Sequence, residues 1–220
     1  MDLLSSQNSP DLRRIAALPW LLVLAWGLLG WACRPDTYRG GLNVALGYET
    51  DTLLFDTVLV QAGSITKRFK VYNPSNQDLL VDRIALGSAL AGGSRPSGFR
   101  LNINGLAANQ AQNLRLAAGD SLYIFAEVTV NPNDSLTPYL VTDSVLFFTG
   151  QRVGKVMLTA FGQNARFYRD SIIGTTVWTK DLPIVIYNSI LVDSQATLWI
   201  QPGTRIFLNA GSSIFVNGTL

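Results

Sequence analysis

Residues 121–130 read SLYIFAEVTV, and this stretch decides the fold class. Every second residue from Leu122 to Val130 is apolar, whereas Tyr123, Phe125, Glu127 and Thr129 form the alternate set. A period of two is typical of a β-strand with one face in a core and the other largely in water. Residues 131–134 (NPND) then supply the turn chemistry that ends such a strand.

Other short strands are expected on both sides of this one. Phe69 and Val71 alternate with polar or aromatic neighbours before the turn residues 73–76 (NPSN). The other predicted strands are Leu53–Val60, Leu79–Leu86, Phe99–Ile103, Asp143–Phe148 and Lys155–Phe161. About seven to nine short strands divided by turns predict an all-β chain with an antiparallel sandwich over residues 43–163.

Residues 64–74 (SITKRFKVYNP), followed by residues 79–84, resemble an immunoglobulin-like domain of the PapD-like group. In that group, a strand that ends in asparagine leads through a polar turn to a second apolar strand. Residues 116–121 (LAAGDS) resemble a turn of these domains, with Ala118 where proline is common, and Phe161-Gly162 resembles their final strand. The resemblance implies an immunoglobulin-like sandwich and brings no catalytic residues.

The composition excludes several classes of function. The chain has 220 residues, of which 48% are hydrophobic and 15% charged, so it is not a disordered tail. A net charge of +2 gives no basic excess, and we expect no nucleic-acid partner. The absence of histidine excludes Ser-His-Asp and Cys-His catalysis and every zinc site that contains histidine. We therefore expect no catalytic residue, no cofactor and no metal site.

The N-terminal segment indicates export. Arg13 and Arg14 precede residues 15–32 (IAALPWLLVLAWGLLGWA), a run without a charge, and Cys33 follows as the single cysteine of the chain. This arrangement resembles a bacterial lipoprotein signal, in which the cysteine sulfur is lipidated and the cysteine becomes the new N-terminus. The resemblance implies a helical signal peptide over residues 1–32, lipid attachment at Cys33 and a tether over residues 33–42. One alternative stays open, a leader that is never cut and anchors the chain as a spanning helix.

The pattern changes after Asn164. Short apolar runs recur at intervals of roughly six to nine residues, divided by polar and glycine-rich turns, as in a solenoid. Residues 196–204 also align with residues 212–219 after one gap. Residues 166–220 resemble the opening coils of a right-handed parallel β-helix. Because a solenoid needs about three repeats and a polar cap, we expect a longer protein of which this chain is the front part. The alternative is a few strands that complete the sandwich or form a small second sheet.

Three polar clusters suggest binding sites, but each is better explained as an ordinary surface feature. Glu49, Asp51 and Asp56 lack the dense spacing of a calcium loop, and Gly92-Gly93-Ser94 lacks the lysine of a phosphate loop. Arg68 and Lys70 share one strand face and Lys67 lies on the other, and such lysines more often prevent strand-to-strand aggregation than form a basic patch.

The C-terminal segment holds charged residues of the types used by solenoid enzymes that cut acidic polysaccharides. They are Asp170, Lys180, Asp181, Asp193 and Arg205, and no pair recurs at a coil spacing, so isolated solvated charges are the preferred interpretation. Trp178 and Trp199 are candidates for stacking on sugars, although Trp199 could equally fill a core.

These observations predict a non-enzymatic exported lipoprotein, with membrane attachment through the lipid and a polysaccharide or protein surface as its further partner. The whole layout resembles uncharacterised lipoproteins of Bacteroidetes, which implies an outer-membrane or cell-surface location. The alternative function is the N-terminal part of a β-helix polysaccharide lyase or hydrolase whose catalytic coils lie beyond residue 220.

Overall fold

The computed structural model describes residues 44–90 and 97–220. This part of the chain is all-β, apart from the single helical turn α3 (Gly87–Leu90). Cys33, with the predicted signal and tether, lies outside the described residues, and so does the Gly92-Gly93-Ser94 loop. Among the described residues, no helix combines the length and the apolarity needed to span a bilayer.

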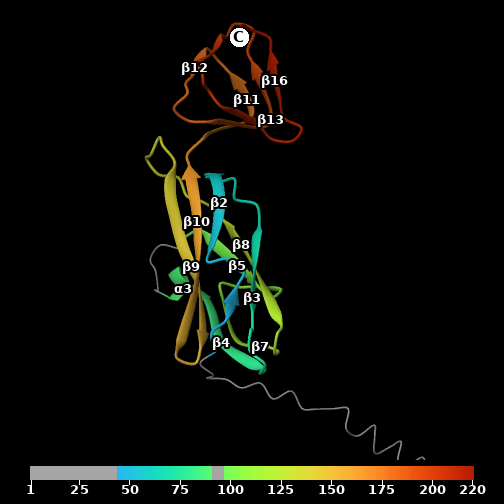
Figure 1. Cartoon of the computed structure of the whole chain (residues 1–220). Coiled ribbons are helices and arrows are strands. Elements are labelled where there is room, and N and C mark those ends of the chain that lie inside the picture. The colour runs from blue at the N-terminus through green and yellow to red at the C-terminus, as the bar shows by residue number, and fades with distance from the viewer. Residues whose placement is uncertain (1–43, 91–96) are drawn as a thin grey trace, which may run out of the picture. The chain divides into compact units, whose positions relative to one another are not determined.

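Two five-stranded sheets form a β-sandwich (Figure 1). The β8 sheet contains, in spatial order, β1 (Gly47–Tyr48), β3 (Lys67–Tyr72), β8 (Ser121–Val128), β5 (Phe99–Ile103) and β6 (Leu106–Ala107). The β9 sheet contains β2 (Thr52–Leu59), β10 (Arg152–Gln163), β9 (Tyr139–Thr149), β4 (Leu79–Leu86) and β7 (Gln110–Leu116). Both sheets contribute side chains to one hydrophobic core, which joins them face to face.

The strand order matches that of immunoglobulin-type sandwiches. The order β1-β3-β8-β5 corresponds to strands A, B, E and D, and the order β10-β9-β4 corresponds to G, F and C. Neighbouring strands are antiparallel except β2 and β10, which run parallel. The expected antiparallel sandwich is confirmed, and it includes this one parallel pair because the chain leaves β1 in the β8 sheet and continues as β2 at the edge of the β9 sheet.

The alternation of residues 121–130 is confirmed by burial. Leu122, Ile124 and the other apolar members of the set are buried, whereas Tyr123 and Phe125 are only partly covered. From the neighbouring strand β3, Phe69 reaches the same core, and its ring meets Phe147 of β9 edge-on at a centroid distance of 6.3 Å. Contacts of this kind between the two sheets supply most of the free energy that stabilises a sandwich.

Tyr48 packs at the margin of this core. Its ring centroid lies 5.1 Å from that of Phe147, and burial raises the pKa of its hydroxyl to about 12. In the unfolded chain the hydroxyl ionises near pH 10, so above that pH the unfolded state loses a proton that the folded state retains. The contribution of Tyr48 to stability is therefore complete below pH 10 and is lost as the pH rises toward 12.

We expect Tyr48→Phe to abolish this part of the alkaline destabilisation, because phenylalanine keeps the ring and has no proton to lose. Free energies of unfolding of both proteins, measured by urea denaturation at several values between pH 9 and pH 12, check this expectation. The variant should gain on the wild type as the pH rises. A difference that stays constant over this range would contradict the burial of the hydroxyl.

The C-terminal strands pair in parallel, and together they are called the ladder (residues 166–219). Strands β11 (Arg166–Ile173), β13 (Ile184–Val192), β15 (Ile206–Leu208) and β16 (Ser213–Val216) form one sheet, and β12 (Thr176–Trp178) and β14 (Leu198–Ile200) form another (Figure 1). A separate core of buried residues fills the ladder, with Trp178, Ile184 and Leu198 fully buried. The pattern after Asn164 is thus a parallel arrangement with its own interior, not a few strands that complete the sandwich.

The two paired strands β11 and β13 each contain a residue with left-handed backbone conformation, at neighbouring positions. Asp170 and Asn188 have φ angles of 47° and 61°, and the Asn188 amide donates to the Asp170 carboxylate over 2.8 Å. The pairing of β11 with β13 shifts register at this point, between Arg169 and Ser171. Aspartate and asparagine tolerate positive φ better than other non-glycine residues, so the sequence suits this conformation.

Candidate functional site

The outer face of the β8 sheet gathers aromatic and cationic side chains. The residues that project there include Arg68 and Lys70 from β3, Tyr123, Phe125 and Glu127 from β8, and Arg100 and Asn102 from β5. The antiparallel register places Lys70 opposite Tyr123, Phe125 between Arg68 and Asn102, and Arg100 opposite Glu127. Because side chains opposite one another in a sheet lie close together, these residues form one surface, here called the outer face.

Two cations converge on Tyr123. The guanidinium carbon of Arg68 lies 4.9 Å from the centroid of the tyrosine ring, and the Lys70 ammonium lies 5.3 Å from it. Hydrogen bonds from Lys70, and next from Arg68, lower the pKa of the Tyr123 hydroxyl below its ordinary value of 10.0. In the described part of the chain, no carboxylate forms an ion pair with either cation. The Glu49 carboxylate accepts the backbone N–H of Lys70 over 2.8 Å.

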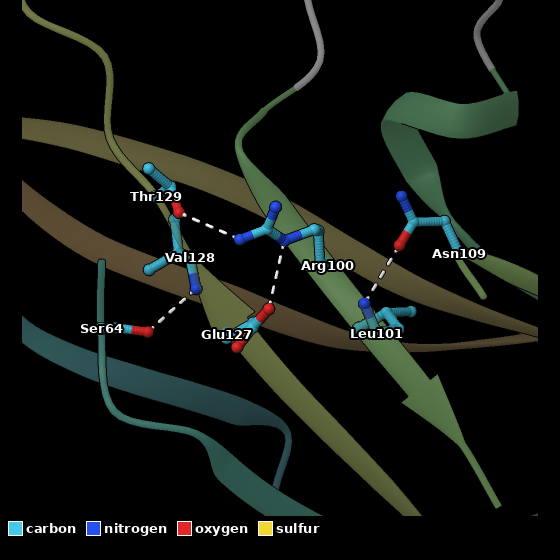
Figure 2. A network of polar contacts seen from close by, with 7 residues as sticks. All are labelled: Ser64, Arg100, Leu101, Asn109, Glu127, Val128 and Thr129. Atoms are coloured by element: carbon cyan, nitrogen blue, oxygen red, sulfur yellow. Dashed lines mark hydrogen bonds and ion pairs between the residues drawn. The ribbon is translucent and has the colours of Figure 1, made fainter. Parts of the chain in front are cut away.

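A hollow of about 580 Å³ lies beside this cluster, over strands β8 and β5. Phe125, Asn102 and Glu127 line it from the sheet, and Asn109 lines it from the turn between β6 and β7. The Asn109 carboxamide oxygen accepts the backbone N–H of Leu101 over 3.0 Å, as Figure 2 shows. Asn102 uses its oxygen in the same way, for the backbone N–H of Gly105. Both side chains are held in place through their oxygens, and each retains an NH₂ group as a donor.

Arg100 closes one side of the hollow. Its Nε donates to the Glu127 carboxylate over 3.1 Å, and one of its terminal nitrogens donates to the Thr129 hydroxyl over 3.3 Å (Figure 2). Both partners belong to the segment of β8 and its continuation, so the guanidinium lies across the neighbouring strand. The contacts orient this cation while leaving part of its donor set for a ligand.

Lys67 and the acidic residues considered for a calcium site each make their own local contacts. Lys67 lies on the opposite side of β3 from Arg68 and Lys70, donates to the Leu54 carbonyl over 2.9 Å, and lies 3.7 Å from the Asp56 carboxylate. Asp51 accepts the backbone N–H of Met157 through its own carbonyl. The structure does not bring Glu49, Asp51 and Asp56 together, and no cluster of three metal-ligating side chains occurs among the described residues.

The candidates in the ladder are also dispersed. Asp170 contacts Asn188, and Asp193 accepts the backbone N–H of Ser194 over 2.7 Å, so neither belongs to a shared carboxylate site. Lys180 and Asp181 lie in the connection before β13, and Arg205 lies directly before β15. The positions do not form one cluster.

The two tryptophans of the ladder have opposite environments. Trp178 is 0% exposed and packs on Tyr168, so its candidacy for stacking on a sugar was wrong. Trp199 is 63% exposed and lies beside Val177 on the outer side of β14, so it is not a core residue. The difference follows from strand alternation, because Trp178 falls on the inward set and Trp199 on the outward set.

Tyr123 and Phe125 were not predicted as site residues. The alternation placed them correctly on the less buried side of their strand, but nothing in the sequence indicates which strand lies beside β8. The sequence did single out Arg68 and Lys70, because these two basic residues share one face of their strand. Its interpretation as a guard against aggregation was incomplete, because β8 pairs with the whole of β3 and sets Tyr123 beside both cations.

Comparisons with known proteins add little to this geometry. No family model and no curated protein matches the chain. Solved structures that align with it include the E. coli chaperone DraB (13% identity, TM-score 0.35, covering 58% of this chain and 57% of that one). Others are the Salmonella enterica SafA pilin in complex with the SafB chaperone (12%, 0.32, 58% and 58%) and a Porphyromonas gingivalis W83 protein of unknown function (13%, 0.35, 60% and 60%). The alignment spans less than two thirds of each of these chains. The TM-scores of these alignments are 0.35 or lower, and the strand order of the two sheets is what defines the immunoglobulin-type fold.

Proposed function

We propose that this protein is an exported lipoprotein that displays a non-catalytic binding body at a membrane surface. The lipid on Cys33 anchors the chain, residues 33–42 act as a tether, and the sandwich presents the outer face to a partner. One acyl chain gives only marginal membrane binding, so durable anchoring takes the two or three chains that lipoproteins of this kind carry. The resemblance to Bacteroidetes lipoproteins favours the outer membrane or cell surface.

The observation that carries the proposal is the outer face itself. Arg68 and Lys70 contact Tyr123 without an ion-pair partner among the described residues, next to a hollow with amide donors. Cations in such a position interact more strongly with an incoming anion than cations already paired with carboxylates. An open face of this kind suits binding, since a sheet surface fixes side chains in a regular array.

The proposal extends to the ladder, which we assign as the first coils of a right-handed parallel β-helix. Arg166 pairs with Ile184 and Ile184 with Ile206, and on the second sheet Thr176 pairs with Leu198. A chain that returns to the same register in successive parallel strands on two sheets has the connectivity of coils. Such a body would extend the displayed surface.

Fatty-acid labelling tests the anchor. Bacteria that express the full chain are grown with a radiolabelled or clickable fatty acid, alongside cells that express Cys33→Ala. We expect the label to enter the wild type only, and the variant to accumulate as the uncut precursor, because the sulfur is the site of attachment. Equal labelling of both proteins, or an unmodified Cys33 with Met1 retained in the wild type, would contradict the proposal. Ser5→Ala, in the polar start of the leader, is the control that should leave labelling unchanged.

A further inference from the structure

The charge and shape of the outer face restrict the class of ligand. Arg68, Lys70 and Arg100 contribute three cations from two strands that flank β8. The acidic residues that face them are Glu127, which pairs with Arg100, and Glu49, which contacts the backbone of Lys70. The cations are therefore in excess on this surface, most clearly around Tyr123.

The arrangement of the rings argues against nucleic acid. Base stacking needs an aromatic face that is open to solvent. Arg68 and Lys70 lie over the Tyr123 ring, and Phe125 is partly covered and packs near Tyr123 at a centroid distance of 6.2 Å. The Tyr123 ring thus positions the cations, and Phe125 forms part of the wall of the hollow. The polar groups that meet a ligand are donors: ammonium, guanidinium and phenol around Tyr123, and the amides of Asn102 and Asn109 in the hollow.

From this donor set we infer that the outer face binds an acidic glycan, with an anionic group held by Arg68, Lys70 and the Tyr123 hydroxyl. The neighbouring sugar lies in the hollow, where the Asn102 and Asn109 amides donate to its hydroxyl groups. A charged headgroup alone would leave the hollow unfilled, and a neutral glycan would leave the cations unpaired. This inference rests on the proposed display function and names the ligand class of its binding surface.

A direct binding measurement tests the inference. The full chain in detergent micelles is titrated against polygalacturonate and its methyl ester, and against dextran sulfate and dextran, so that each polymer pair differs in its anionic groups. We expect binding to at least one of the charged polymers and little to its neutral counterpart, with an affinity that falls as salt is added. Equal affinity for charged and neutral members of a pair would overturn the inference.

Matched variants locate the site. The double variant Arg68→Gln with Lys70→Gln should bind at least about tenfold more weakly, because two charge-assisted hydrogen bonds are lost. The control is Arg152→Gln with Lys155→Gln, which removes the same charge from exposed positions of β10 on the other sheet. Tyr123→Phe should weaken binding by a smaller factor, since the ring that positions the cations remains.

Each other outcome contradicts the inference in a recognisable way. Equal weakening by both double variants would mean that overall charge, not the outer face, attracts the polymer. Binding to phosphatidylglycerol vesicles without binding to either charged polymer would indicate a lipid surface instead. Absence of binding to all probes would overturn the ligand class, while the labelling of Cys33 decides independently whether the chain is an anchored display protein.

Discussion

Replacing Trp178 with alanine is expected to unfold the ladder while leaving the sandwich intact. Trp178 is the largest side chain of the ladder core, is completely buried, and packs its ring on Tyr168 at a centroid distance of 5.3 Å. Removing a buried tryptophan costs about 3–5 kcal/mol through lost transfer free energy and the cavity that remains. Trp178 is the only aromatic residue among the eight buried members of the ladder core, and a loss of this size is comparable to the stability of a small structural unit.

Hydrogen–deuterium exchange of the full chain separates the two parts of the molecule. Faster exchange in Trp178→Ala should be confined to the strands of the ladder, since amide protection follows local opening. The matched control is Trp199→Ala, which removes the same side chain from an exposed position on the neighbouring strand β14. It should change the free energy of unfolding by only about 0.5 kcal/mol or less. Similar exchange in both variants would contradict the inward and outward assignment of the two rings.

Trp178→Phe makes the test sharper. The indole N–H of Trp178 is buried without a hydrogen-bond partner in the described structure, and an unsatisfied buried donor costs free energy. Phenylalanine removes that donor and retains most of the apolar ring. We therefore expect Trp178→Phe to lose much less protection than Trp178→Ala. Equal losses would mean that the ring volume is not what stabilises the ladder.

Sequence patterns predicted strands that are rich in apolar side chains and bounded by turn residues, including β4, in which the alternation breaks between Val81 and Ile84. The predicted ranges 79–86 and 99–103 coincide with β4 and β5, and the start of β8 coincides with residue 121. Strand β7 was missed because only Ala111 and Leu116 of its seven residues are buried, and these two fall on opposite phases of a period of two. Asn113 between them has a φ of 54°, and this left-handed residue shifts the phase without leaving an apolar signal in the sequence.

The ladder shows a second limit of sequence patterns. Residues 196–204 and 212–219 resemble one another, but they are not stacked in that register. Ile190 pairs with Ile214, and Thr197 pairs with Thr219. Short apolar runs separated by turns form all the strands of the ladder. Similarity between two such runs therefore does not show that they pair with each other.

The outer face could be predicted only in its parts. The sequence places Arg68 and Lys70 on one side of their strand, and Tyr123 and Phe125 on one side of another. Whether these sides meet depends on the pairing of β3 with β8, two strands far apart in the chain. The cation contacts at Tyr123 are therefore a product of topology, and the apolar pattern that defines the core contains no information about them.

The turn after β3 depends on one buried amide. Asn73 is 0% exposed; its Nδ2 donates to the carbonyls of Gln77 (2.7 Å) and Ala117 (3.0 Å), and its Oδ1 accepts the backbone N–H of Ser75 (3.0 Å). The backbone of Asn73 also accepts from Gly119 and donates to Asp120. A single side chain thereby fastens the turn that follows β3 to the turn that precedes β8, the two strands that form the outer face.

Asn73→Asp is expected to destabilise the sandwich by about 3 kcal/mol or more at pH 7, because a carboxylate of the same shape points an acceptor at two carbonyls and removes their donor. The loss should shrink in acid. Burial next to carbonyl oxygens raises the pKa of the new carboxyl above its unfolded value of about 3.9, and the neutral acid can donate to one carbonyl. Since the folded state then holds the proton more tightly than the unfolded state, the variant gains stability relative to the wild type as the pH falls from 7 through the folded pKa.

Asn76→Asp supplies the control, because it makes the same change at an exposed position of the same turn and should stay within about 0.5 kcal/mol of the wild type. Urea denaturation at pH 7 and pH 4.5 measures all three proteins, and equal stabilities of the two variants at pH 7 would show that the amide of Asn73 does not join the turns.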